Sequence, residues 1–236
     1  MAQMQIQNDR VTLRGVHSIR LLTLAGVLGS LLFVFGSTID GFLRPGYSPI
    51  HQVVSDLGIG ENAWILNTDL VVFGLLFMFF ALGFSQAMRK LMGGRKLMAS
   101  TLLLLLTGAG AVNDGLFAEY NPADPTTAFR DMLHSLGFLI GFVSLIIALF
   151  VIGLHLRKDR AWRGYGWYSI LTSLVTLLLL LLPYVFPLYG AQLGGLNERM
   201  LLVVAFAWHV VTGWRLFALE GPQQDGSYVM PITSRL

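Results

Sequence analysis

The chain has 236 residues, of which 55% are hydrophobic and only 12% are charged. A soluble domain of this length carries roughly twice that charged fraction, so an ordinary soluble globular protein is excluded. The absence of cysteine excludes disulfides, thiolate metal sites and a cysteine nucleophile. The net charge of +3 does not indicate a nucleic-acid partner, because the basic residues lie at the ends of apolar runs rather than along one face.

Six apolar segments are long enough, or nearly so, to cross a bilayer, which takes about 20 helical residues. They are residues 19–39, 63–87, 96–113, 132–156, 165–189 and 198–219. We interpret the first as an uncleaved span rather than a signal peptide, because its apolar core is long and no good cleavage site follows it. Runs such as Leu102–Leu106 lack the alternation of membrane strands. We therefore predict an all-α polytopic membrane protein with six transmembrane helices in one bundle.

The basic residues predict the orientation of this bundle. With six spans, one side of the membrane holds Arg10, Arg14, Arg20, Arg89, Lys90, Arg95, Lys96, Arg157, Lys158, Arg160, Arg163 and Arg215. The positive-inside rule makes that side cytoplasmic, so both termini are expected in the cytoplasm of a multi-pass cell-membrane protein. We expect residues 1–18 to form a cytoplasmic segment, 19–219 the membrane domain, and 220–236 a cytoplasmic tail.

The loop after the first span contains the first candidate site residues. His51 and Ser55 are four residues apart and would share a face if residues 50–57 form a helical turn, with Asp56 beside them. A histidine next to a serine and an acid can activate a nucleophile. Alternatively, Ser55 or Asp56 caps a short interfacial helix that Gly58 ends.

A second set of candidates surrounds the start of the fourth span. Asp131 and His134 are three residues apart and lie on one helix face, where the acid could orient the histidine as a base. Alternatively, Asp131 interacts with the helix dipole and His134 is an ordinary interfacial residue. The outer histidines and acids also suggest a divalent metal site, such as zinc. Its candidate ligands are His51, Asp56, Asp114 and His134.

Two ionisable residues fall inside predicted spans, where such groups usually face the bundle interior or a wet cavity. Asp69 lies about two turns into the second span, and His209 lies near the middle of the sixth. Alternatively, Asp69 lies at the interface and His209 is a neutral histidine bonded to a neighbouring hydroxyl or carbonyl. Pro183 and Pro187 predict a kink or an early end of the fifth span.

Two short motifs resemble a known family. Tyr47-Ser-Pro with Val54-Ser55-Asp56-Leu57-Gly58, and then Asp131-x-x-His134-x-x-Gly137, resemble the prokaryotic membrane family called domain of unknown function 998. The layout is also similar to the eukaryotic family of damage-regulated autophagy modulators and FGF-receptor-activating proteins. The resemblance implies a six-helix bundle with both termini inside. The matching positions are Ser55, Asp56 and His134, whereas His51 is not part of the family pattern. One eukaryotic branch acts in remodelling lipid-anchored proteins, so the resemblance implies that the protein handles lipids.

Three functions are compatible with these residues. The first is a lipid-handling protein that performs hydrolysis or acyl transfer in a polar pocket at the outer interface, with a histidine base or a metal-activated water. The second is a non-catalytic accessory or scaffold subunit of a larger membrane complex. The third is a small transporter, for which Asp69 and His209 would be the only ionisable groups along a path through the membrane. The expected partners are membrane lipids or such a complex.

Overall fold

The structure, a computed structural model, describes residues 2–119 and 125–219, with side chains from Ser18 onward. Its elements are α1 (Ala2–Leu43), η1 (Ser55–Gly58), α2 (Trp64–Met88), α3 (Gly94–Leu116), η2 (Pro125–Thr127), α4 (Ala128–Leu156), α5 (Arg163–Val185) and α6 (Pro187–Leu219). Each of the six α-helices is long and apolar enough to cross a membrane. The described residues contain no strand, so the prediction of an all-α protein with six transmembrane helices is confirmed.

The largest departure from the predicted boundaries lies between the last two helices. α5 ends at Val185, two residues after Pro183, and α6 begins at Pro187, where the missing N–H costs no helical hydrogen bond. The outer loop expected near residues 190–197 is therefore helical, with a kink at Leu193. The prolines end the fifth span early, as predicted, but the sixth helix starts eleven residues before its predicted start at 198.

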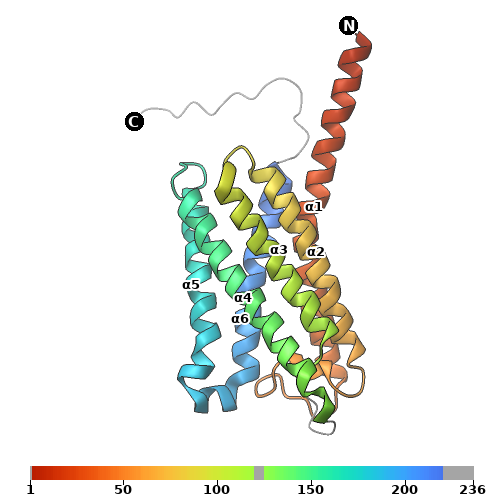
Figure 1. Cartoon of the computed structure of the whole chain (residues 1–236), viewed down its shortest axis with the longest axis vertical. Coiled ribbons are helices and arrows are strands. Elements are labelled where there is room, and N and C mark those ends of the chain that lie inside the picture. The colour runs from red at the N-terminus through yellow and green to blue at the C-terminus, as the bar shows by residue number, and fades with distance from the viewer. Residues whose placement is uncertain (1, 120–124, 220–236) are drawn as a thin grey trace.

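The helices form a closed ring in chain order. Each α-helix packs against its neighbours in sequence, and α6 closes the ring by packing against α1 (Figure 1). Glycines allow the closest approaches: a Cβ at Gly74 would lie 2.5 Å from the carbonyl oxygen of Gly108, and one at Gly110 would lie 2.5 Å from that of Gly137. Gly137 and Gly141 of α4 both border Gly110 of α3, so these glycines allow close packing within one chain.

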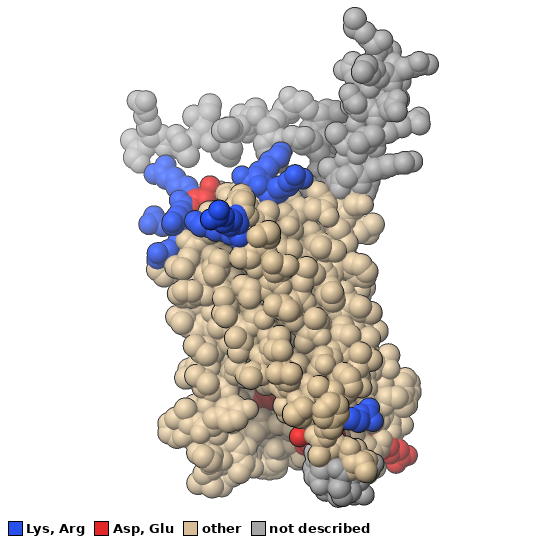
Figure 2. All heavy atoms as spheres, in the orientation of Figure 1, with Lys and Arg blue, Asp and Glu red and all other residues tan. Residues whose placement is uncertain are grey.

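Charge divides the two ends of the bundle. Most of the lysines and arginines gather at the end where α1 starts and α6 finishes, and an uncharged surface separates them from the opposite end (Figure 2). We call these the basic end and the outer end. Large apolar side chains such as Phe79, Leu171 and Val203 are exposed along the uncharged surface, as lipid-facing positions require. That the basic end is cytoplasmic stays a prediction.

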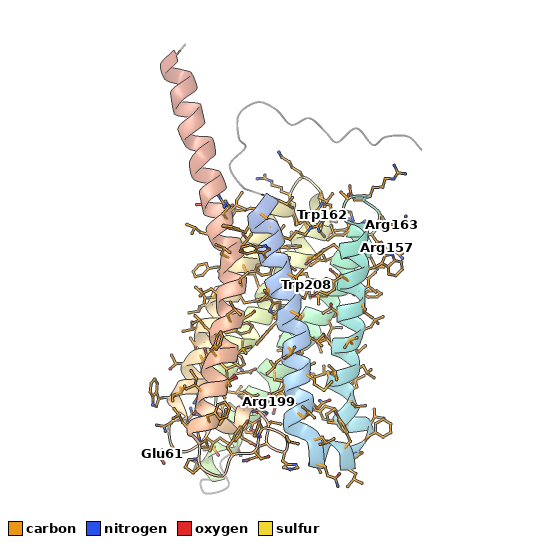
Figure 3. The ribbon with its side chains drawn as sticks, turned by 180° about the vertical axis from the view of Figure 1, so that it is seen from behind. Glu61, Arg157, Trp162, Arg163, Arg199 and Trp208 are labelled. Carbon is orange, nitrogen blue, oxygen red and sulfur yellow. The ribbon has the colours of Figure 1, made fainter. Side chains whose placement is uncertain are left out.

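Aromatic side chains fill the interior from the middle of the bundle toward the basic end. Phe77, Phe80 and Trp208 are fully buried there, and the Trp208 indole donates a hydrogen bond to the Ser169 hydroxyl at 2.9 Å (Figure 3). His209 packs among these rings, with its centroid 4.3 Å from that of Phe77. Because this half is closely packed, the open space inside the ring lies toward the outer end.

Candidate functional site

A cavity of about 70 Å³ runs along the inside of the ring. Side chains from α1, α2, α3, α4 and α6 line it, together with Val54 and Ser55 of the first outer loop. Its polar lining residues are Ser55, Asp114, His134 and Glu198 near the outer ends of their elements, and Thr107 and His209 deeper inside. The rest of the lining is mainly phenylalanine, leucine and alanine. The space is thus polar at its outer end, which we call the mouth, and largely apolar below.

Glu119 connects two of the predicted site residues at the mouth. The Ser55 hydroxyl donates a hydrogen bond to Glu119 Oε1 at 2.6 Å, and His134 Nε2 lies 3.8 Å from the same oxygen. Each residue comes from a different element: Ser55 begins η1, Glu119 follows α3, and His134 lies in the second turn of α4. A serine, a carboxyl and an imidazole are therefore adjacent where the cavity reaches the outer end.

The tautomer of His134 follows from its backbone partners. Its Nδ1 lies 2.8 Å from the carbonyl oxygen of Phe117 and 3.1 Å from that of Asp114. Both partners are acceptors only, so Nδ1 carries a proton, and in the neutral ring the lone pair is on Nε2. The last turn of α3 thus fixes the ring so that its basic nitrogen faces Glu119.

α6 holds the loop that presents Ser55. Arg199 donates to the carbonyl oxygens of Pro49 and Gln52 at 2.8 and 3.0 Å, and also to the Tyr47 hydroxyl (Figure 3). The neighbouring Glu198 accepts a hydrogen bond of 2.6 Å from the backbone N–H of Val54. These contacts tie the residues just before Ser55 to the outer end of α6.

Asp114 is a buried acid of the mouth whose carboxyl interacts with the Asn113 side chain and the Phe138 backbone. Its side chain is 6% exposed, and Oδ1 has no hydrogen-bond partner among the described residues. A Cβ at Gly137 would collide with this oxygen, so the glycine makes room for the carboxyl against α4. A buried oxygen without a donor costs free energy, so a donor supplied by a ligand would relieve that cost.

Glu119 and Asp56 lie outside the membrane-spanning segments, and the pKa of each is raised. Burial raises the pKa of Glu119 above its ordinary value of 4.5, and the charges of Asp56 and Asp131 raise it further. The hydrogen bond from Ser55 and the proximity of His134 oppose this shift. Burial likewise raises the pKa of Asp56, against the hydrogen bond from the Val53 backbone and the charge of Arg199. Glu119 therefore keeps its proton to a higher pH than a free glutamate does.

This shift predicts a pH dependence of stability. A carboxyl whose pKa is raised by folding binds more protons in the folded state, so stability falls as pH rises from its ordinary value through the raised one. We expect Glu119→Gln to flatten the rise in thermal midpoint of purified protein as the pH is lowered toward the ordinary glutamate pKa. Glu61→Gln, at an exposed acid of the same end, should leave the slope as in wild type. Equal slopes in all three proteins would contradict the assignment.

The structure does not bring all of the predicted site residues together. His51 lies in a turn before η1, and its Nδ1 is 2.6 Å from the carbonyl oxygen of Gln192 on α6. His51 and Ser55 therefore contact different elements and share no helical face. Asp56, and Asp131 on α4, are close enough to Glu119 for their charges to raise its pKa. Ser55 and His134 are thus the predicted candidates that share a partner, whereas His51 lies apart.

The proposed metal ligands do not fit one ion. Within the part of the chain that the structure describes, no three histidine or acidic side chains lie close enough together to hold a metal. His51 is directed to a backbone carbonyl, and His134 uses Nδ1 on two others. The set of His51, Asp56, Asp114 and His134 is therefore not assembled, and no chemical step is assigned to a metal.

The two intramembrane candidates have separate surroundings. The Asp69 carboxyl lies against Gly36 of α1, where a Cβ would collide with it, and Oδ2 has no partner among the described residues. His209 lines the inner part of the cavity, and its Nδ1 is 3.4 Å from the Ser30 hydroxyl. The alternative interpretation of His209 as a histidine bonded to a neighbouring hydroxyl agrees with this contact. Only His209 of these two lines the cavity.

Sequence reasoning missed two residues of the mouth, Glu119 and Glu198. Both were expected on the outer side but not as site residues. Glu119 follows a span and precedes Tyr120-Asn-Pro, so its surroundings gave no periodic signal. Glu198 was not chosen as a candidate because the opposite charge of the adjacent Arg199 suggests an ordinary surface pair. An available signal was that Glu198 follows a mostly uncharged stretch of α6 and lies close to the membrane interior.

The fold and the cavity define a multi-pass membrane protein with an internal cavity toward one end of a six-helix ring. Its sequence matches the family described as a protein of unknown function (DUF998) over residues 27–215, and the chain belongs to that family. Neither the curated proteins nor the solved structures provide a match. The predicted membership is thus confirmed, and the match spans all six membrane helices.

Proposed function

We propose that the protein binds a membrane amphiphile in its central cavity and acts on it at Ser55, Glu119 and His134 by hydrolysis or acyl transfer. The observation that carries this proposal is the distribution of polarity along the cavity. The outer mouth holds the serine, acids and histidine, and an apolar channel extends from there to His209. Ligand sites generally combine apolar walls with a few convergent polar groups. An acyl chain would occupy the apolar part, and its ester would lie at the mouth.

The chemistry would use groups already in contact. The ionised Glu119 would take the Ser55 proton along their 2.6 Å hydrogen bond, while Ser55 Oγ forms a bond to the acyl carbon and the ester C–O bond breaks. Glu119 would return that proton to the departing oxygen. Water or an acceptor alcohol would then release the acyl group in the same way. The raised pKa of Glu119 makes it a stronger base than a free glutamate, and His134 would stabilise its charged form when Nε2 carries a proton.

The similarity to the eukaryotic family noted above also supports lipids as ligands, since one of its branches acts on lipid-anchored proteins. A membrane lipid is the only partner that this proposal requires. An accessory role in a larger complex would need no apolar channel behind a polar mouth.

Filling the cavity should displace the ligand. Ala111 lines the cavity on α3, so Ala111→Leu is expected to reduce the lipid retained by detergent-purified protein at least about tenfold, since the added carbons occupy the channel. Mass spectrometry of extracted lipids measures this. Ala99→Leu on the same helix is the matched control, because Ala99 is exposed to the membrane and should retain wild-type lipid.

The acyl-transfer step is tested separately, with p-nitrophenyl dodecanoate as the probe ester. Ser55→Ala should abolish acyl release while retaining bound lipid, and Glu119→Gln should also abolish acyl release. Retained lipid without any acyl release by the wild type would remove the catalytic part of the proposal. Equal lipid in wild type and Ala111→Leu would overturn the proposal as a whole, and would favour an accessory or scaffold role.

A further inference from the structure

The mouth of the cavity offers mainly hydrogen-bond acceptors to a ligand. The Ser55 hydroxyl already donates to Glu119, and the protonated nitrogen of His134 already donates to backbone carbonyls. Deeper in the cavity, the Thr107 hydroxyl donates to carbonyl oxygens of α3 and α4. What remains available is carboxyl oxygen, so a ligand head that supplies donors would complement the mouth.

The acids of the mouth outnumber the nearby cations. Asp114, Glu119 and Glu198 lie at or beside the cavity, and Asp56 is close enough to raise the pKa of Glu119. Arg199 is the guanidinium nearest to this group. Unless His134 is protonated, the mouth therefore has an excess of potential negative charge.

Arg199 and Arg44 are not free to bind an anionic head group. Arg199 donates to three backbone carbonyls, those of Pro49, Gln52 and Gly195, as well as to Tyr47. Arg44 donates to the carbonyls of Leu57 and Ile59. Both guanidinium groups therefore hold the loop in place. Neither of these two arginines is therefore free to pair with a phosphate or carboxylate at the mouth.

Asp114 provides the independent indication of a ligand. Its side chain lines the cavity, is 6% exposed, and has an oxygen without a hydrogen-bond partner among the described residues. A space-filling view shows a hollow near the outer end of α4 and α6 with an acidic side chain inside it (Figure 2). The Asp114 side chain is thus part of the wall of the space that a ligand would enter.

We propose that the amphiphile bound by this protein carries a positively charged amine as its head group, held by Asp114 and Glu119 with Glu198 close by. This inference deepens the proposed function and rests on it. An ammonium supplies three N–H donors and one positive charge, which match the unpaired oxygen of Asp114 and the acids around it. An opposite charge brought close to crowded carboxyls also relieves their mutual repulsion.

Three probes with one chain length test the head group. Hexadecylamine, hexadecanol and hexadecanoate are titrated into the full-length protein in neutral detergent, and each Kd is measured by displacement of a fluorescent fatty-chain probe. We expect the amine to bind at least about tenfold tighter than the alcohol, the factor that a charged hydrogen bond contributes, and the carboxylate to bind most weakly. Asp114→Asn and Glu119→Gln should each lower the preference for the amine while leaving alcohol binding unchanged.

The control is Glu61→Gln, which removes an acid at the periphery of the same end (Figure 3). It should keep the full preference for the amine. If all three probes bind equally, or if both mouth variants keep the preference, the head-group assignment is overturned while the proposed function stands. If no chain binds the wild type, both fail.

A short amine distinguishes the source of the ligand. Propylamine has the same head without the chain, so it should displace the probe far more weakly than hexadecylamine if the ligand is a membrane amphiphile. Propylamine as tight as hexadecylamine would keep the amine site but overturn its assignment to an amphiphile. Asp114→Asn could disturb packing against Gly137, so Glu119→Gln, which retains the size of the side chain, keeps the test decisive.

Discussion

Gly110→Val is expected to destabilise the folded bundle strongly. A Cβ at Gly110 would lie 2.5 Å from the Gly137 carbonyl oxygen and 2.9 Å from the Gly141 Cα, all of which are backbone atoms. No flexible side chain can move aside, so α3 and α4 would have to separate. Overpacking of this kind costs about 3 kcal/mol or more. For a chain of this size, that loss lowers the thermal midpoint by roughly 6–12 °C.

Thermal unfolding and size-exclusion profiles in detergent measure the effect of Gly110→Val. The matched control is Gly93→Val in the connection between α2 and α3, where a Cβ would meet nothing within 4 Å and φ is −81°. The control should stay within about 0.5 kcal/mol of wild type. Equal midpoints for the two variants would mean that α3 and α4 do not approach as closely as the glycines indicate.

Arg199→Met is expected to release the first outer loop from α6 without unfolding the bundle. The variant keeps much of the apolar stem but leaves the carbonyls of Pro49 and Gln52 without the donors that hold them. The loss is smaller than the about 1–3 kcal/mol of a buried acceptor without a partner, because the Pro49 contact is exposed to water and the Gln52 carbonyl keeps its contact with the Tyr47 hydroxyl. Ser55 follows that loop directly, so ligand retention should fall together with loop order.

Hydrogen–deuterium exchange over residues 47–58 is the measurement that separates loop release from global unfolding. Exchange in this segment should rise in Arg199→Met, while the middle of α2 and α4 stays protected. Arg130→Met is the matched control, because Arg130 is exposed and makes one long contact of 3.5 Å to the Leu116 carbonyl. Similar exchange in both variants would show that Arg199 does not hold the loop.

The membrane helices could be predicted because each one is defined locally. A run of apolar residues must form a helix in lipid to satisfy its own backbone, whatever its neighbours do. α2 and α4 show this, since both begin within four residues of the prediction. The start of α6 could not be found in the same way. Its first turns contain Gly190, Gln192 and Gly194, and they pack against the first outer loop rather than lipid.

The composition of the mouth could be predicted only in part, because it depends on contacts between distant segments. Ser55 and His134 were found from residue type and position, but nothing near them in sequence indicates that Glu119 joins them. His51 was a candidate because of its local spacing to Ser55, yet the chain turns between them. Glu198 joins the mouth through a hydrogen bond from the backbone N–H of Val54, which lies 144 residues earlier in the chain.

The closed order of the ring has a consequence for biosynthesis. Each helix from α2 to α5 can dock on the one made before it, so the bundle grows by addition of neighbours during synthesis. α6 is the last helix to enter the membrane, and it supplies the contact that joins the end of the ring to α1. It also brings Glu198, Arg199 and His209. Until α6 has been made, a nascent chain therefore has an open-sided groove facing lipid and a first outer loop that lacks its contacts with α6, and the cavity is enclosed only when α6 packs against α1.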